Sequence, residues 1–195
     1  MIKAVKYVLL ALLIATTPKL YAEDWSEKAM VERREGAVVS YRAKLDGNIL
    51  LVEVTHAPGW HTYAIDNVER ARKKTGKAKP ETELPTRVAL SGGLKAVGAW
   101  FQSKPKELSQ PDIRWYTWGF EGTARFAVKV ERVKGASATI KINGQACNAS
   151  LCSMIDNITL SLPLPSDAQL DSAEAKTTVD FSKLVKVTTA KQDPK

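Results

Sequence analysis

The sequence predicts an all-β fold, an immunoglobulin-like β-sandwich with a cysteine-bearing hairpin and an irregular C-terminal tail. Apolar and polar residues alternate with a period of two through most of the chain, which is typical of strands that bury one face. Turn signals such as Asp46-Gly47 separate these runs at short intervals, and the centre of the chain lacks the longer period of an amphipathic helix. Seven or so short strands of this kind are typical of an immunoglobulin-like sandwich.

The first predicted strands form a hairpin. Val39, Tyr41 and Ala43 alternate with polar residues, and Asp46-Gly47 then turns the chain into an apolar run at residues 49–54. Further strands are expected at residues 86–90, 94–100, 123–130 and 137–143, and a last one carries Ile158, Leu160 and Leu162 on one face.

The N-terminus has the pattern of an export signal. Lys3 and Lys6 precede an apolar run at residues 8–15, and Leu20-Tyr21-Ala22 fits a cleavage site, so residues 1–22 are interpreted as a signal peptide. No other apolar run approaches the ~20 residues that a membrane helix requires. The sequence therefore predicts a soluble periplasmic protein with no transmembrane segment after removal of the signal.

The rest of the chain is expected to form one domain at residues 23–165, followed by a tail or tether at residues 166–195. The whole sequence is basic, with 29 Lys and Arg against 21 Asp and Glu. Much of this excess lies in residues 70–79, within an irregular region at residues 64–84, and the run contains no aromatic residue. Because nucleic-acid sites combine basic with aromatic residues, a solvated loop is favoured and no nucleic-acid partner is expected.

Both cysteines of the chain lie in Cys147-Asn148-Ala149-Ser150-Leu151-Cys152, at the turn of a predicted hairpin. In an exported protein such a pair predicts a disulfide. Closing so small a ring stabilises a fold by only about 2 kcal/mol, compared with roughly 4 to 5 kcal/mol for a ring of a hundred residues. A structural bond, a redox-active bond and a metal-binding pair all remain open from the spacing alone.

The alternation of inward and outward positions along the two strands does not place the two cysteines on the same face of the sheet. Cys152 continues the inward phase of the last strand, whereas Cys147 is one residue out of phase with Ile140 and Ile142. Bringing both cysteines to one face requires an extra residue, and Gly144 is the expected place for a bulge. The cysteines would then form a cross-strand pair with Cα atoms about 4.5 Å apart, a separation at the low end for a disulfide that favours easy reduction.

Three segments resemble one known family. Residues 139–152, with the following strand that ends in Leu162-Pro163-Leu164, resemble the redox hairpin of the N-terminal domain of DsbD. Gly59-Trp60-His61-Thr62-Tyr63 resembles the stretch beside the disulfide in this family, and Trp115 to Val130 resembles its cap-loop region. The resemblance spans roughly residues 35–165, and a stand-alone form without the membrane and C-terminal thioredoxin domains is expected.

The resemblance implies a periplasmic domain whose cysteine pair passes reducing equivalents to or from thioredoxin-fold proteins. Cys147 and Cys152 would cycle between disulfide and dithiol, with an activity of the protein-disulfide reductase type and without a cofactor. Analogy with the family favours Cys152 as the sulfur that bonds to partners.

A reducible bond of this kind requires a shield against unspecific thiols. The aromatic cluster Trp115, Tyr116, Trp118 and Phe120 is a candidate for covering the sulfurs and opening on docking, and Tyr63 is a further candidate. Ordinary packing of these aromatic residues in the core is the alternative.

Two other classes of function remain open. A periplasmic copper protein would bind Cu(I) through Cys147, Cys152, Met154 and either His61 or His56, since soft ions prefer sulfur ligands. A non-enzymatic sandwich that binds other proteins would use the disulfide only as a structural bond.

Overall fold

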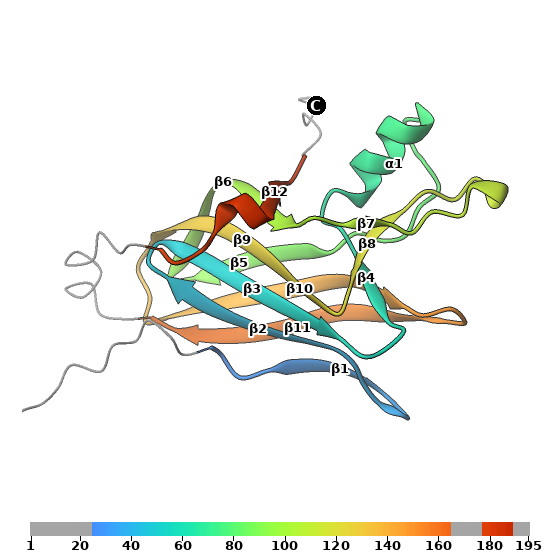
Figure 1. The fold of residues 1–195 in the computed structure, drawn as a ribbon. Helices are drawn as coiled ribbons and strands as arrows, with labels where there is room; N and C mark the ends of the chain where they lie inside the picture. Colours follow the sequence, from blue (N-terminus) through green and yellow to red (C-terminus); the bar gives the residue numbers. More distant parts are fainter. Residues whose placement is uncertain (1–24, 165–176, 189–195) are drawn as a thin grey trace, which may run out of the picture.

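Two antiparallel sheets face each other across one core, as the sequence predicts for a β-sandwich (Figure 1). The computed structural model describes residues 25–164 and 177–188. The predicted signal peptide at residues 1–22 and most of the predicted tail lie outside the described residues.

The first sheet has six strands in the described part of the chain, in the order β1-β2-β3-β9-β6-β12. Their bounds are β1 Ala29–Arg33, β2 Gly36–Asp46, β3 Ile49–His56, β9 Thr123–Arg132, β6 Leu94–Ser103 and β12 Leu184–Lys186. The hairpin predicted around Asp46-Gly47 is confirmed, because Asp46 pairs with Ile49 across a two-residue turn.

The second sheet has six strands among the same residues, in the order β11-β10-β4-β8-β7, with β5 also paired to β10. Their bounds are β11 Cys152–Pro163, β10 Ser137–Cys147, β4 His61–Tyr63, β8 Trp118–Glu121, β7 Lys106–Glu107 and β5 Arg87–Gly92. Strand β10 therefore has two partners along one edge, β5 for residues 138–143 and β4 for residues 146–147. The change of partner occurs beside the cysteines.

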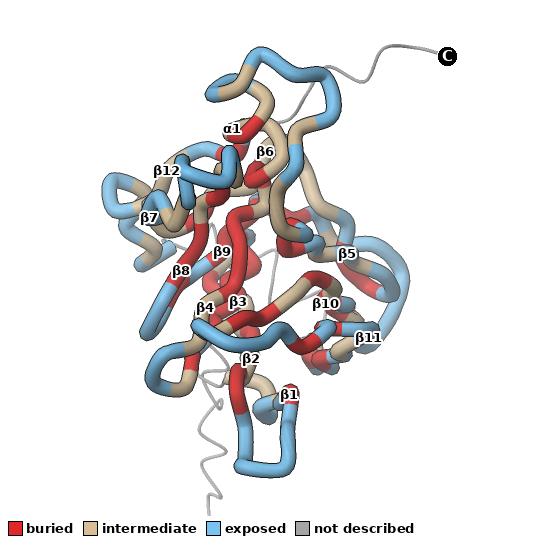
Figure 2. The backbone as a smooth tube through the Cα atoms, turned by 90° about the vertical axis from the view of Figure 1, so that its right-hand side faces the viewer, coloured by how far each residue is buried: buried red, intermediate tan, exposed pale blue. Residues whose placement is uncertain are grey.

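The core consists of the inward positions of both sheets, which the alternation predicted. Figure 2 shows buried positions along β3, β8 and β9 and exposed positions in the peripheral loops. The largest fully buried apolar side chains are Tyr41, Phe126, Leu50, Ile140, Ile142, Ile155 and Leu160. Phe126 also contacts Phe120 edge to face, with ring centroids 5.6 Å apart.

Helix α1 (Asn67–Thr75) corrects the prediction of a solvated loop for the basic run. Glu69 lies in its first turn and Arg72, Lys73 and Lys74 in its last, which complements the helix dipole. The helix ends at Gly76, whose φ of 70° provides the left-handed cap. The basic run therefore spans the end of a short helix and the loop that follows it.

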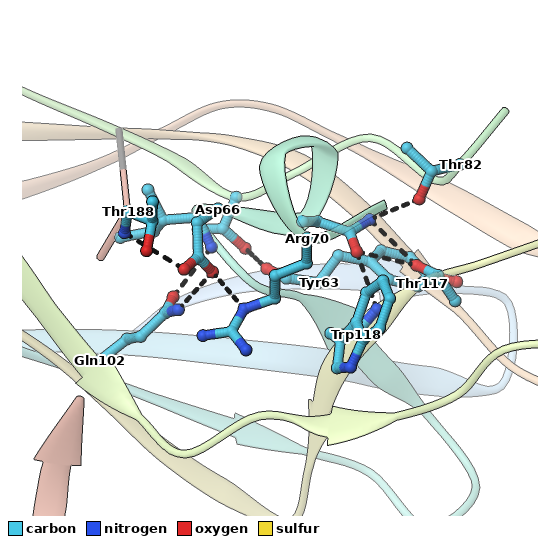
Figure 3. A network of polar contacts seen from close by, with 11 residues as sticks. Tyr63, Asp66, Arg70, Thr82, Gln102, Thr117, Trp118 and Thr188 are labelled. Atoms are coloured by element: carbon cyan, nitrogen blue, oxygen red, sulfur yellow. Dashed lines mark hydrogen bonds and ion pairs between the residues drawn. The ribbon is translucent and has the colours of Figure 1, made fainter. Parts of the chain in front are cut away.

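Buried polar contacts fix the start of α1 to the sandwich (Figure 3). The carboxylate of Asp66 accepts hydrogen bonds from Arg70 on the helix, from Gln102 on β6 and from the backbone N–H of Thr188. Because Asp66 and Gln102 are buried, these bonds hold α1 at a defined place at one end of the sandwich.

Part of the predicted tail packs on the first sheet. Residues 177–188 contribute a short 3₁₀ helix, η3 (Phe181–Lys183), and β12, which pairs with β6. Phe181 contacts Phe101 edge to face, with ring centroids 5.0 Å apart, and both pack against Ile49 and Leu51 on the outer face of β3. This segment thus covers apolar side chains that alternate with the inward face of β3.

We expect Phe181→Ala to lower the free energy of unfolding by about 1–2 kcal/mol, because a partly buried aromatic side chain is lost. Urea unfolding followed by circular dichroism measures the change. Lys183→Ala, on the same short helix but at an exposed position, should change the stability by no more than about 0.5 kcal/mol. Equal stability of Phe181→Ala and the parent chain would mean that residues 177–188 do not support the sandwich.

Within residues 25–164 and 177–188, no helix has the length and apolar character needed to cross a bilayer.

Candidate functional site

The cysteine hairpin lies at the tip of β10 and β11. Cys147 ends β10 and Cys152 begins β11, and the two residues stand directly opposite each other in register. Their sulfurs are bonded, and their Cα atoms are 4.0 Å apart, slightly closer than the predicted separation. Asn148 organises the turn, since its side-chain oxygen accepts hydrogen bonds from the N–H groups of Ser150 and Leu151.

The predicted bulge is present, but its extra residue belongs to the other strand. The register shifts between Ile142 and Gly144: from one paired position to the next, β10 advances by two residues and β11 by three. The extra residue lies at Asp156 or Asn157, and Asn157 has a left-handed φ of 52°. The prediction of an inward Cys152 is therefore wrong, because the bulge moves Cys152 to the outer face of the sheet, where Cys147 already lies.

The two sulfurs differ in exposure. The Cys147 residue is 3% exposed, whereas Cys152 is an exposed residue. Three of the large apolar residues exposed in the described chain surround this hairpin: Leu84 at 45%, Leu151 at 40% and Met154 at 61%. Of the two cysteines, Cys152 is therefore the one more open to an attacking group from solution.

Residues 82–86 pass beside the disulfide and the neighbouring Gly144. A Cβ added to Gly144 would lie 3.2 Å from the carbonyl oxygen of Pro85, and Gly144 has a φ of 154°, so this position requires glycine. The segment ends at Thr86, whose hydroxyl and N–H both donate to the carbonyl of Tyr63 on β4. A small hollow of about 260 Å³ lies next to it, between Leu84, Arg87 and Met154.

Asn67 holds the other end of this segment. Its side-chain N–H groups donate to the hydroxyl of Thr82 at 3.0 Å and to the carbonyl of Glu83 at 2.9 Å. Its side-chain oxygen accepts from the N–H of Trp118 at 2.7 Å, and Figure 3 shows this network around Thr82, Thr117 and Trp118. Because Asn67 is fully buried, it ties the segment beside the disulfide to both α1 and β8.

Glu83 and Gln145 lie next to the sulfurs. One carboxylate oxygen of Glu83 and the two sulfurs all lie within 4.8 Å of one another. The side-chain amide of Gln145 donates to Glu83 at 2.8 Å and to the sulfur of Cys147 at 3.2 Å. Burial raises the pKa of Glu83, while the hydrogen bond from Gln145 lowers it less strongly. Sequence reasoning missed Glu83, because it lies 64 positions before Cys147 and belongs to no motif.

Of the predicted shielding residues, Tyr63 lies at the site. Its hydroxyl is 3.0 Å from Nε2 of His61, and β4 pairs His61 with Cys147. Burial, and then the charge of Glu83, raise the pKa of Tyr63. Burial lowers the pKa of His61 and Glu121 opposes this shift, so His61 is predominantly neutral at pH 7.

Trp115 and Tyr116 lie in the loop between η2 (Pro111–Ile113) and β8. The carbonyl of Tyr116 accepts a hydrogen bond from the hydroxyl of Thr82, and its ring faces the ammonium of Lys74 on α1 at 6.0 Å. These contacts link the loop to residues 82–86 and to α1. Phe120 packs in the core, which agrees with ordinary packing for that member of the cluster.

The proposed copper ligands are not all together. His56 is buried, with one ring nitrogen 2.8 Å from the carbonyl of Gly122 and the other 2.8 Å from the hydroxyl of Thr62, on the inner side of β4. Met154 is paired with Gln145 and shares the face of the cysteines. In the bonded form the sulfurs offer no thiolate, which is the state that binds soft metal ions.

Comparison with known proteins gives one family match. The family model for the N-terminal part of the thiol:disulfide interchange protein DsbD matches residues 27–164. No curated protein matches the sequence.

Several solved structures are similar to this chain, and two of them show how low the sequence identity is. The N-terminal periplasmic domain of ScsB from Proteus mirabilis is 18% identical, with a TM-score of 0.47; the match covers 79% of this chain and 60% of that one. The chain thus spans less than two thirds of the ScsB chain. The DsbD N-terminal domain of Neisseria meningitidis in the reduced form is 12% identical, with a TM-score of 0.43, and the match covers 66% of this chain and 86% of that one.

Proposed function

Because the chain belongs to the family of N-terminal domains of the thiol:disulfide interchange protein DsbD, we propose that it is a thiol:disulfide exchange module. Its cysteine pair alternates between the disulfide and the dithiol and transfers two electrons in each cycle. The observation that carries the proposal is the exposed Cys152, bonded to the buried Cys147 at the tip of a hairpin.

The exchange begins at Cys152. A thiolate of a reduced dithiol partner attacks the Cys152 sulfur, the bond to Cys147 breaks, and its electron pair passes to the Cys147 sulfur. The second thiolate of the partner then attacks the partner's own sulfur in the mixed disulfide and releases Cys152. The partner leaves as a disulfide and the module as a dithiol, and the same steps in reverse deliver the electrons to an oxidised acceptor.

The partner class is a thioredoxin-fold protein of the periplasm, acting as electron donor or acceptor. Leu84, Leu151 and Met154 provide an apolar rim around the exposed cysteine, which suits docking of another protein. Cys152 lies in a strand and not at a helix N-terminus, the position in which thioredoxin-type motifs activate their cysteine. An activated thiolate must therefore be supplied by the partner, which favours partners with an acidic cysteine.

The shield is formed by residues 83–85 and Tyr63, with the loop that carries Trp115 and Tyr116 as its support. The hydrogen bond from Thr82 to Tyr116 couples the loop to the segment beside the disulfide. Movement of the loop on docking would widen the access of the partner to the bond between Cys152 and Cys147.

The proposal is tested by mixing the oxidised mature protein with a reduced thioredoxin-fold protein and following both redox states by thiol alkylation and mass spectrometry. We expect the two proteins to exchange electrons and reach a measurable equilibrium. A structural disulfide has a potential below about −300 mV and would stay oxidised against a glutathione series. Persistence of the bond in both experiments would contradict the proposal.

A further inference from the structure

Opening of the disulfide places negative charge on the sulfur of the buried Cys147. Attack at the exposed Cys152 makes Cys147 the leaving sulfur, and this sulfur receives an electron pair in a position where the residue is 3% exposed. A buried, unpaired thiolate is strongly disfavoured, because burial penalises the charged form. A proton donor beside Cys147 would remove this penalty.

We propose that Glu83 is the general acid that protonates the Cys147 sulfur as the disulfide opens, and that Gln145 positions the carboxyl group for this step. The inference rests on the proposed function, since it concerns the same bond, but it assigns a role to two residues outside the cysteine motif.

The geometry supports this assignment through three contacts. The amide nitrogen of Gln145 is 2.8 Å from the Glu83 carboxylate and 3.2 Å from the Cys147 sulfur, so one side chain contacts both the acid and the leaving atom. The carboxylate oxygen lies within 4.8 Å of the sulfur, which a small side-chain rotation or one water molecule bridges. Asn67 holds the backbone of Glu83 in place through its carbonyl.

The proposed step balances in atoms and electrons. The attacking thiolate forms a bond to the Cys152 sulfur, and the disulfide bond breaks with its electron pair on Cys147. The protonated carboxyl group of Glu83 transfers its proton to that sulfur, which leaves a Cys147 thiol and a Glu83 carboxylate. The carboxylate regains a proton from solvent before the next cycle. In the reverse direction the carboxylate accepts the proton of the Cys147 thiol as that sulfur attacks.

The surroundings of Glu83 favour its acid form. Burial raises its pKa toward the range in which a carboxyl group acts as an acid near neutral pH. The other ionisable groups near Glu83 among the described residues include Tyr63 and His61 on β4, Glu121 on β8, which acts on His61, Arg87 at the start of β5, and Asp156 on β11, which lines the same hollow as Leu84 and Arg87. Of these, His61 is the alternative proton donor, and it requires a control.

The test measures reduction of the oxidised protein by dithiothreitol as a function of pH, with each rate constant divided by the dithiothreitol thiolate concentration. We expect the normalised constant to fall by about tenfold as the pH rises through the pKa of Glu83, because the acid form is lost. Glu83→Gln should give a constant that is independent of pH and close to the low value of the parent protein at high pH.

Three further variants sharpen the result. Glu81→Gln, an exposed position two residues earlier in the same segment, and His61→Asn should both retain the parent pH profile. In Gln145→Leu the normalised rate constant should fall at a higher pH than in the parent protein, because the hydrogen bond from Gln145 lowers the pKa of Glu83. A purely structural role for Gln145 would leave the midpoint unchanged.

Two outcomes would overturn the assignment. In the first, the normalised rate constant of Glu83→Gln is independent of pH but equals the high value that the parent protein shows at low pH. This result would mean that ionised Glu83 only repels the attacking thiolate. Loss of the pH dependence in His61→Asn would transfer the role to the histidine. Dithiothreitol replaces the protein partner in this test, so a negative result for Glu83 does not contradict exchange with thioredoxin-fold proteins. Conversely, the pH dependence of reduction by dithiothreitol can be measured even if that exchange does not occur.

Discussion

A Cys147→Ser variant is expected to capture a thioredoxin-fold partner as a stable mixed disulfide, whereas Cys152→Ser is expected to capture none. In Cys147→Ser the remaining thiol is the exposed Cys152, and the thiol that would resolve the complex is absent. In Cys152→Ser the remaining thiol is Cys147, which is buried and lies beside residues 82–86. Each variant keeps one thiol and the two differ only in its position, so the contrast reports accessibility directly.

The measurement uses a partner with one active-site cysteine, activated as a mixed disulfide with thionitrobenzoate. We expect Cys147→Ser to release the coloured thiol stoichiometrically and Cys152→Ser to react at least about 100-fold more slowly, as thiol exchange depends on access. The Cys147→Ser/Cys152→Ser double variant sets the background. Each variant loses about 2 kcal/mol of stability with the bond, so circular dichroism must first show that all three remain folded. Equal reaction of the two single variants would contradict the site described here.

The second large effect is expected from Asn67→Ala, which should lower the free energy of unfolding by about 3 kcal/mol and speed reduction of the disulfide by small thiols. The substitution leaves the partly buried N–H of Trp118 and carbonyl of Glu83 without their partner, at a cost of about 1–3 kcal/mol for each group. It also frees residues 82–86, which pass beside the disulfide. Urea unfolding measures the first effect, and the rate of reduction by glutathione at one fixed pH above the pKa of Glu83, where its acid form does not contribute, measures the second.

Lys73→Ala is the matched control for this prediction. Lys73 lies on the same helix at an exposed position, and its loss should change the stability by no more than about 0.5 kcal/mol and leave the reduction rate unaltered. If Asn67→Ala lowers the stability but not the protection of the disulfide, residues 82–86 are not the shield.

The alternation of apolar residues was sufficient to predict the sandwich and most of its longer strands. Strands β2, β9 and β10 bury mainly one face each, so their period of two is visible in the sequence, whereas the apolar run of β3 is buried on both faces. Helix α1 was missed because its exposed basic residues dominate its short sequence. Asp66 before it and Gly76 after it are nevertheless the boundary signals of a helix.

The sequence was sufficient to predict the disulfide of the site but not the residues around it. The cysteine spacing indicated the bond, and the phase of the strands showed that one extra residue was needed. The alternation pattern does not show which strand holds that residue. In the structure it lies on β11, where Asn157 takes the left-handed conformation. Glu83 and Asn67 were not predicted, because their roles arise from contacts between segments far apart in the sequence.

The unequal exposure of the two cysteines also bears on how the reduced form survives peroxide and other oxidants. Sulfenic acid forms most readily on a thiol that is both ionised and open to solvent. Cys147 is a buried residue, and Cys152 is open to solvent but lies on a strand and not at a helix N-terminus, where thiolates are stabilised. Neither sulfur combines the two conditions, so the hairpin holds its electrons for a partner that arrives with its own activated thiol and loses few of them to chemical damage.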